Sequence, residues 1–178
     1  MTVQSFETKV MKNLLIAITF FSMLLSGCKV TYSFRGGEIP GKTFSVGTLT
    51  NSASLVNPNL AIVMQDKLQE KFTNESNLKY TDGNGDANFS GRITSYKVSP
   101  VQGTGATTVA LNRLTIAVEF LYTNPDDKTV PEEGKVIKVS SYDDFESNED
   151  FSSIEDELME SISEKLVALV YNQVLVDW

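Results

Sequence analysis

The chain of 178 residues contains no histidine and a single cysteine, Cys28. Without histidine it lacks the commonest general base, the usual hydrolase triads and the side chain on which most transition-metal sites depend. One cysteine is too few for an internal disulfide or for the thiolate set of a structural zinc site. We therefore expect a protein that is not an enzyme, that holds no metal and no cofactor, and that is stabilised by core packing.

A basic stripe of the kind that binds nucleic acid is also missing, and the net charge is −8. Residues 28–125 carry nine Lys or Arg against seven Asp or Glu, whereas residues 126–178 carry four against fifteen. Residues 143–164 hold ten carboxylates and no basic side chain, which argues against nucleic-acid binding. Two readings of this acidic region stay open: a solvated helix face with its loop, or a docking surface for a basic partner.

Cys28 follows an almost wholly apolar run at residues 14–25. Twelve residues rise only about 18 Å as a helix, too short to span the hydrocarbon core, so the run is typical of a secretory signal. The positions before the cysteine are Leu25, Ser26 and Gly27. They resemble the bacterial lipobox, which implies a diacylglycerol thioether on Cys28, cleavage before it, and acylation of the new amino terminus with a fatty acid such as palmitate. The alternative is an ordinary signal peptide followed by a free thiol.

This pattern divides the chain into a signal peptide at residues 1–27, a lipidated tether at residues 28–41 and a single domain at residues 42–178. The first ten residues include Glu7 and are unlike a positive signal start, so translation from Met11 is an alternative. The acyl chains fix the mature protein to the membrane, since two or more chains give stable anchoring.

Hydrophobic periodicity predicts six elements in the mature chain. Strands are expected at residues 43–50, 87–98, 113–122 and 135–141, and helices at residues 57–72 and 152–174. The apolar phase of the second strand shifts near Thr94 and Ser95, which indicates a bulge. Asn57 is expected to cap the first helix, with Pro58 at its first position.

The second helix opens with Ser152 and Glu155, which fit a capping box. The order β-α-β-β-β-α predicts an α+β fold, a two-layer sandwich in which a four-stranded mixed sheet carries both helices on one face. The first two strands are expected to be parallel across the helix that joins them, and the last three to form an antiparallel meander.

Two constellations of polar residues are candidate binding sites. Residues 82–86, DGNGD, open like a calcium loop but lack the glycine and the bidentate glutamate that follow in one, so we favour a plain turn. Arg92, Lys97 and Arg113 cluster around residues 99–110 if the flanking strands pair. They are either ordinary charges on the solvent face of the sheet or a phosphate-recognising patch.

Several segments together resemble the lipopolysaccharide-assembly lipoprotein family LptE. They are the lipobox at Cys28, Tyr32-Ser33-Phe34, Ile39-Pro40, LVNPNLA at 55–61, ALNRLTI at 110–116 and SSIEDELMESISEKL at 152–166. The match covers nearly the whole mature chain, including the order of its elements.

The resemblance implies an outer-membrane lipoprotein that partners and plugs an LptD-type β-barrel and contacts lipopolysaccharide. Its body would face the periplasm or lie inside the barrel lumen. Arg92, Lys97 and Arg113 are the ligand contacts expected from their position around the loop at 99–110, since the contact residues of the family are not matched position by position. Lys29 after the cysteine, with no aspartate there, favours the outer membrane by resemblance to sorting rules. The alternative is a periplasm-facing lipoprotein that binds a small ligand or a soluble protein outside any barrel complex.

Overall fold

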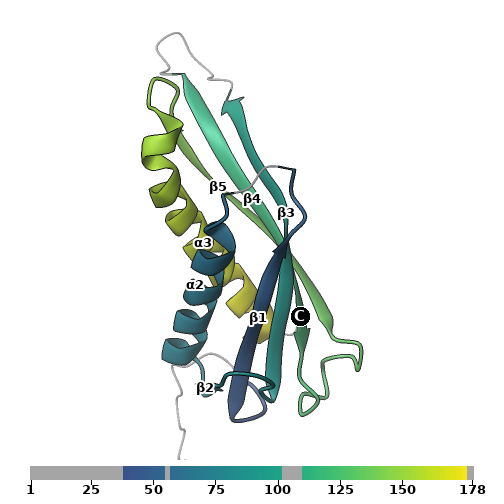
Figure 1. The fold of residues 1–178 in the computed structure, drawn as a ribbon. Coiled ribbons are helices and arrows are strands. Elements are labelled where there is room, and N and C mark those ends of the chain that lie inside the picture. The colour runs from purple at the N-terminus through teal and green to yellow at the C-terminus, as the bar shows by residue number, and fades with distance from the viewer. Residues whose placement is uncertain (1–37, 55–56, 102–109, 176–178) are drawn as a thin grey trace, which may run out of the picture. The chain divides into compact units, whose positions relative to one another are not determined.

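Figure 1 shows the computed structural model of the chain, which describes residues 38–54, 57–101 and 110–175. The expected lipidation site at Cys28, its lipobox Leu25, Ser26 and Gly27, and the loop at 102–109 lie outside the described residues. The elements in chain order are β1 Thr43–Asn51, α2 Leu60–Glu75, β2 Lys79–Tyr80, β3 Ala87–Val101, β4 Leu111–Thr123, β5 Lys135–Glu146 and α3 Phe151–Leu175.

The strands form one mixed sheet in the order β2-β1-β3-β4-β5. β1 is parallel to β3, its neighbour across α2, and β3, β4 and β5 form an antiparallel meander, as predicted. The sheet has five strands and not the expected four, because β2 adds a parallel pair of residues at the edge, Lys79 against Thr43 and Tyr80 against Phe44. Two residues are too few to give a period-two pattern, so the sequence carried no signal for this strand.

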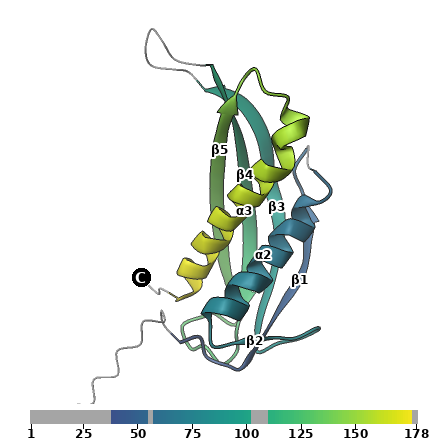
Figure 2. The ribbon, with the colours of Figure 1, turned by 90° about the vertical axis from the view of Figure 1, so that its left-hand side faces the viewer.

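Both helices lie on the same face of the sheet (Figure 2). α2 packs against β1, and α3 packs against β5 and against α2. Between the layers lies a chain of aromatic rings centred on Phe72, which is fully buried. Its ring centroid lies 4.6 Å from that of Phe89, 5.1 Å from that of Tyr171 and 5.7 Å from that of Phe44. One side chain of α2 therefore contacts β1, β3 and α3 together.

Both helix starts differ from the sequence prediction. α2 begins at Leu60 and not at Pro58: the Asn57 side chain accepts a hydrogen bond from the Asn59 N–H, and the Leu60 N–H donates to the Asn57 carbonyl, so Asn57 closes a turn before the helix. At α3 the predicted capping box is wrong, because the helix begins at Phe151, one residue before Ser152. At the helix start the Asp150 side chain accepts a hydrogen bond from the Ser152 N–H.

Glu155, the other half of that expected box, points instead to the sheet. Its carboxylate accepts a hydrogen bond from the Tyr96 hydroxyl of β3. The pKa of the Tyr96 hydroxyl is raised, mainly because the hydroxyl is buried and secondly because it donates to this carboxylate. Glu155 thus bonds to a residue of the sheet and not to the start of its own helix.

The bulge predicted in β3 is confirmed, since the pairing with β4 shifts register between Ile93 and Ser95. Because side chains alternate along a strand, one extra residue changes which positions face outward. Before the bulge Arg92 pairs with Glu119, and after it Lys97 pairs with Thr115. The bulge therefore keeps the even-numbered arginine and the odd-numbered lysine on the same face of the sheet.

The DGNGD turn fastens the start of β1. The Asp86 carboxylate accepts hydrogen bonds from the Lys42 N–H at 2.8 Å and from the N–H and hydroxyl of Thr43 at 3.0 Å each. These bonds, the Lys42 N–H foremost, lower the pKa of Asp86. Asp82 accepts a hydrogen bond from the Tyr80 hydroxyl. Both carboxylates of the calcium-like pattern thus accept hydrogen bonds from protein donors.

The segment just before β1 is also tied to the body. Ile39 is buried, and the Asn77 side chain both accepts from its N–H and donates to its carbonyl. The buried side chain of Asn124 donates to the Pro40 carbonyl and to the Tyr122 hydroxyl. Any attachment at Cys28 would therefore reach the fold through Ile39.

Candidate binding surface

The face of the sheet turned away from the helices is the first candidate, since no other described element covers it (Figure 1). We call it the open face. Alternation along the strands assigns one row of side chains to the core and the next row to this face. On β4 the core row is Leu114, Ile116, Val118, Phe120 and Tyr122, all buried.

Arg92, on β3, contributes one cation to the open face. Its guanidinium lies 2.6 Å from the carboxylate of Glu119 on β4, and Lys138 on β5 lies 3.3 Å from the other oxygen of that carboxylate. Arg92 and Lys138 expose 53% and 74% of their side chains, whereas Glu119 exposes only 21%. The cations therefore flank a covered carboxylate and present their outer surfaces to solvent.

Arg113, on β4, forms a bidentate ion pair on this face. Its Nε and Nη2 donate to the two carboxylate oxygens of Asp144 at 2.6 and 2.8 Å. The guanidinium also lies over the ring of Tyr142, with 3.6 Å between its Cζ and the ring centroid. This pairing raises the pKa of Arg113 and lowers that of Asp144. Part of the donor capacity of Arg113 is thus committed within the sheet.

Lys97 is exposed, and it forms no ion pair within the described part of the chain. It pairs with Thr115 across the strands, so it lies diagonal to Arg113, which opposes Ser99. The structure therefore brings Lys97 and Arg113 together. Arg92 lies five residues from Lys97 along β3, about 15 Å away, so the three expected contact residues form two groups along one face.

Apolar side chains lie among these charges. Val136, Tyr142 and Leu121 expose 55%, 49% and 36% of their surface on the open face. A shallow depression beside Arg92 is formed by Thr48, Thr50, Ser90, Gly91, Arg92, Glu119, Phe120, Leu121 and Val136. Lys138, Val136 and Tyr142 were not among the contact residues predicted from the sequence, although their even-numbered spacing along β5 was a signal that they share one face.

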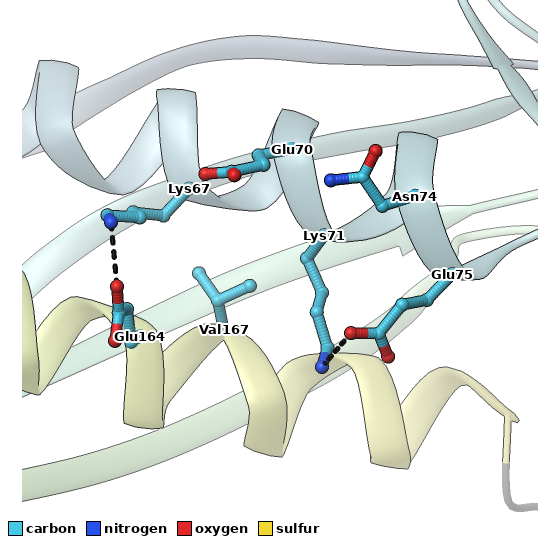
Figure 3. Close-up of a pocket in the computed structure, with 7 residues that line it drawn as sticks. All are labelled: Lys67, Glu70, Lys71, Asn74, Glu75, Glu164 and Val167. Carbon is cyan, nitrogen blue, oxygen red and sulfur yellow. Dashed lines mark hydrogen bonds and ion pairs between the residues drawn. The ribbon is translucent and has the colours of Figure 1, made fainter.

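The helix layer presents a surface of opposite sign. Lys67 of α2 lies 2.7 Å from the carboxylates of both Glu160 and Glu164 on α3. These two hydrogen bonds raise the pKa of Lys67 above its ordinary value. Figure 3 shows Lys67 and Lys71 of α2 pointing toward α3. Lys71 forms an ion pair at 2.6 Å with Glu75, which lies on α2 as well. Both lysines of this shallow pocket are therefore neutralised by neighbouring carboxylates.

The two layers thus differ in charge, although the open face also holds Glu119 and Asp144. The acidic run that the sequence places at residues 143–164 lies partly on α3, whereas the open face carries Arg92, Lys97, Arg113 and Lys138. In the described residues no group of three or more His, Cys, Asp or Glu is arranged to hold a metal ion. No helix among them is long and apolar enough to cross a membrane.

These features define an α+β domain of two layers, in which a pair of helices covers one face of a mixed sheet and leaves the other open. The sequence model of the LptE family, described as lipopolysaccharide-assembly, matches residues 41–174. The chain belongs to this family, and its role lies in lipopolysaccharide assembly, among the lipoproteins of the cell envelope.

The solved structures that match this chain are distant in sequence. A minor lipoprotein from Acinetobacter baumannii is 10% identical, with a TM-score of 0.45, over 75% of this chain and 91% of that one. An uncharacterized lipoprotein B from Nitrosomonas europaea is 11% identical, with a TM-score of 0.49, over 83% of this chain and 91% of that one. None of the curated proteins matches the chain at a significant level.

Proposed function

We propose that the protein is a lipid-anchored, non-enzymatic partner of an LptD-type β-barrel in the outer membrane, with its body inside the barrel lumen. The observation that supports this most directly is the LptE match over residues 41–174, which includes every described element but the end of α3. In this role the protein assists lipopolysaccharide assembly by holding partners together.

The length of chain between the expected anchor at Cys28 and the described body is compatible with this arrangement. Lipidation at Cys28 would leave eleven peptide steps to Ile39, the first buried residue of the body. An extended chain of that length spans at most about 40 Å. The body would thus stay within a membrane's depth of the leaflet that holds the acyl chains, near the barrel it partners.

We assign the lipopolysaccharide contact to the open face. Lipopolysaccharide is anionic, and the exposed basic side chains of this face are the ones that suit phosphate. Lys97 is the cation best placed to bind first, because Arg92 and Arg113 already contact Glu119 and Asp144. A phosphate group reaching the two arginines would have to share them with those carboxylates.

The contact is tested with Lys97→Glu, measured as the affinity of the purified protein for purified lipopolysaccharide. Losing a charge-assisted contact and gaining a repulsive one should weaken binding about ten-fold or more. Lys128→Glu is the control, since it makes the same charge change at an exposed turn position in the loop between β4 and β5. Equal affinities for Lys97→Glu and the control would remove the open face from the proposal.

The barrel partnership is tested by isolating the lipoprotein from detergent-solubilised outer membranes. A large β-barrel should be recovered in a stoichiometric amount. Recovery of a soluble protein or a small ligand in its place would favour the alternative, a periplasm-facing lipoprotein that works outside any barrel complex.

A further inference from the structure

An apolar groove lies on the outer side of the helix layer, between the first half of α2 and the first half of α3. It encloses about 460 Å³, and Ile62, Val63 and Met159 supply its apolar surface. Ile62 exposes 60% of its surface, more than any other large apolar side chain in the described residues. We call this the helix groove.

The rim of the helix groove is acidic. Asp66 of α2 and Asp156 and Glu160 of α3 line it, together with Lys67. Lys67 is already bonded to Glu160 and Glu164, so the one lysine of the groove does not balance the remaining carboxylates. Asp66 and Asp156 are exposed and form no ion pair within the described ranges. The groove thus combines an apolar side chain open to solvent with uncompensated negative charge.

These charges discriminate between occupants. Phosphate-bearing lipid is repelled by the rim, and a second copy docked groove to groove would bring two acidic rims together. A peptide with basic side chains satisfies the rim and can also place an apolar side chain against Ile62.

We propose that the helix groove binds a basic segment of the barrel partner, with an apolar side chain of that segment packed against Ile62. This inference rests on the proposed function and adds an orientation to it. The helix layer faces a basic protein surface of the lumen, and the open face is left for the anionic lipid.

The experiment places a photo-crosslinking amino acid at position 62 of the full-length lipoprotein, expressed with its barrel in the native outer membrane. The same amino acid at position 136, on the open face, is the control. The inference expects position 62 to crosslink to a barrel peptide with net positive charge. Crosslinks only to lipopolysaccharide, to a second copy or to a barrel peptide without net positive charge overturn it, as does no crosslink when the wild-type complex is recovered.

A charge reversal provides the second measurement. Asp66→Lys combined with Asp156→Lys is expected to lower the amount of barrel retained on the lipoprotein by about five-fold or more. Glu132→Lys combined with Glu133→Lys is the matched control, because it makes the same charge change in an exposed turn. Equal retention by the two variants overturns the inference while leaving the barrel partnership standing. If the wild-type protein itself recovers no barrel, the proposed function is wrong, and so is the proposal that a barrel segment binds the helix groove.

Discussion

Phe72 is the side chain through which α2 holds the two layers together, and its replacement by alanine tests the described core. The ring is fully buried and contacts Phe89, Phe44 and Tyr171. Replacing a buried phenylalanine by alanine removes its transfer free energy and leaves a cavity, at a cost of about 3–5 kcal/mol. Because three ring contacts are lost with it, we expect a decrease of about 4 kcal/mol in the free energy of unfolding of Phe72→Ala.

The assay is urea unfolding of the mature chain followed by circular dichroism, with Cys28→Ala in both proteins to keep them free of lipid. With a denaturant slope of about 2 kcal/mol/M, the midpoint should fall by about 2 M. Ile62→Ala is the control on the same helix, because Ile62 is 60% exposed and should change stability by less than about 1 kcal/mol. A loss at Phe72 no larger than at Ile62 would refute the assigned packing.

Three further predictions concern separate contacts. In Gly91→Ala the new Cβ would lie 2.9 Å from a ring carbon of Phe120, so we expect a loss of about 1–3 kcal/mol in urea unfolding. Asp86→Ala should flatten the acid dependence of stability. The lowered pKa of Asp86 means that the hydrogen bonds it accepts from the Lys42 N–H and from Thr43 stabilise the fold above about pH 4 and are lost as the pH falls below that, which thermal unfolding against pH detects. Lys67→Gln should lower the free energy of unfolding by about 1 kcal/mol at low salt, and by less at 1 M salt.

Each of these variants has a control. Gly47→Ala adds a Cβ whose nearest neighbour is 3.4 Å away, so it should be close to neutral, and equal losses at the two glycines would contradict the close packing of Gly91. Lys128→Gln removes a charge that forms no ion pair in the described residues. A salt-independent effect of Lys67→Gln, or an Asp86→Ala protein with an unchanged acid profile, would contradict the assigned contacts.

Much of the fold follows from local periodicity. The two helices, the four long strands and the bulge near Thr94 were predicted, because each shows in the alternation or four-residue spacing of apolar side chains. The parallel first pair was predicted from the helix that joins its two strands. β2 was missed because two residues carry no period. β5 continues to Glu146, beyond the predicted residue 141, because pairing with β4 extends it through polar positions.

The open face was predictable only in part. Alternation along the strands places Arg92, Lys97 and Arg113 outward once the bulge is recognised. Their acidic partners were not predictable, because Glu119 and Asp144 face them from neighbouring strands through a register that a single sequence does not specify. Whether these basic residues touch lipopolysaccharide stays a prediction.

The helix groove shows the same limit. The acidic run of α3 is visible in the sequence, and a docking surface for a basic partner was one of its two readings. The opposing wall comes from α2, about ninety residues earlier, so the approach of Ile62 to Met159 depends on tertiary packing. That packing converts an acidic helix face into a groove with an apolar floor.

If this LptE-family protein works as the partner of one outer-membrane barrel, the two proteins should leave the membrane as one complex. The native mass of the complex released from outer membranes with the full-length lipoprotein tests this. We expect one lipoprotein bound to one LptD-type barrel, with lipopolysaccharide reduced in complexes that carry Lys97→Glu. A mass equal to the lipoprotein alone, or to the lipoprotein with a soluble protein, would contradict it.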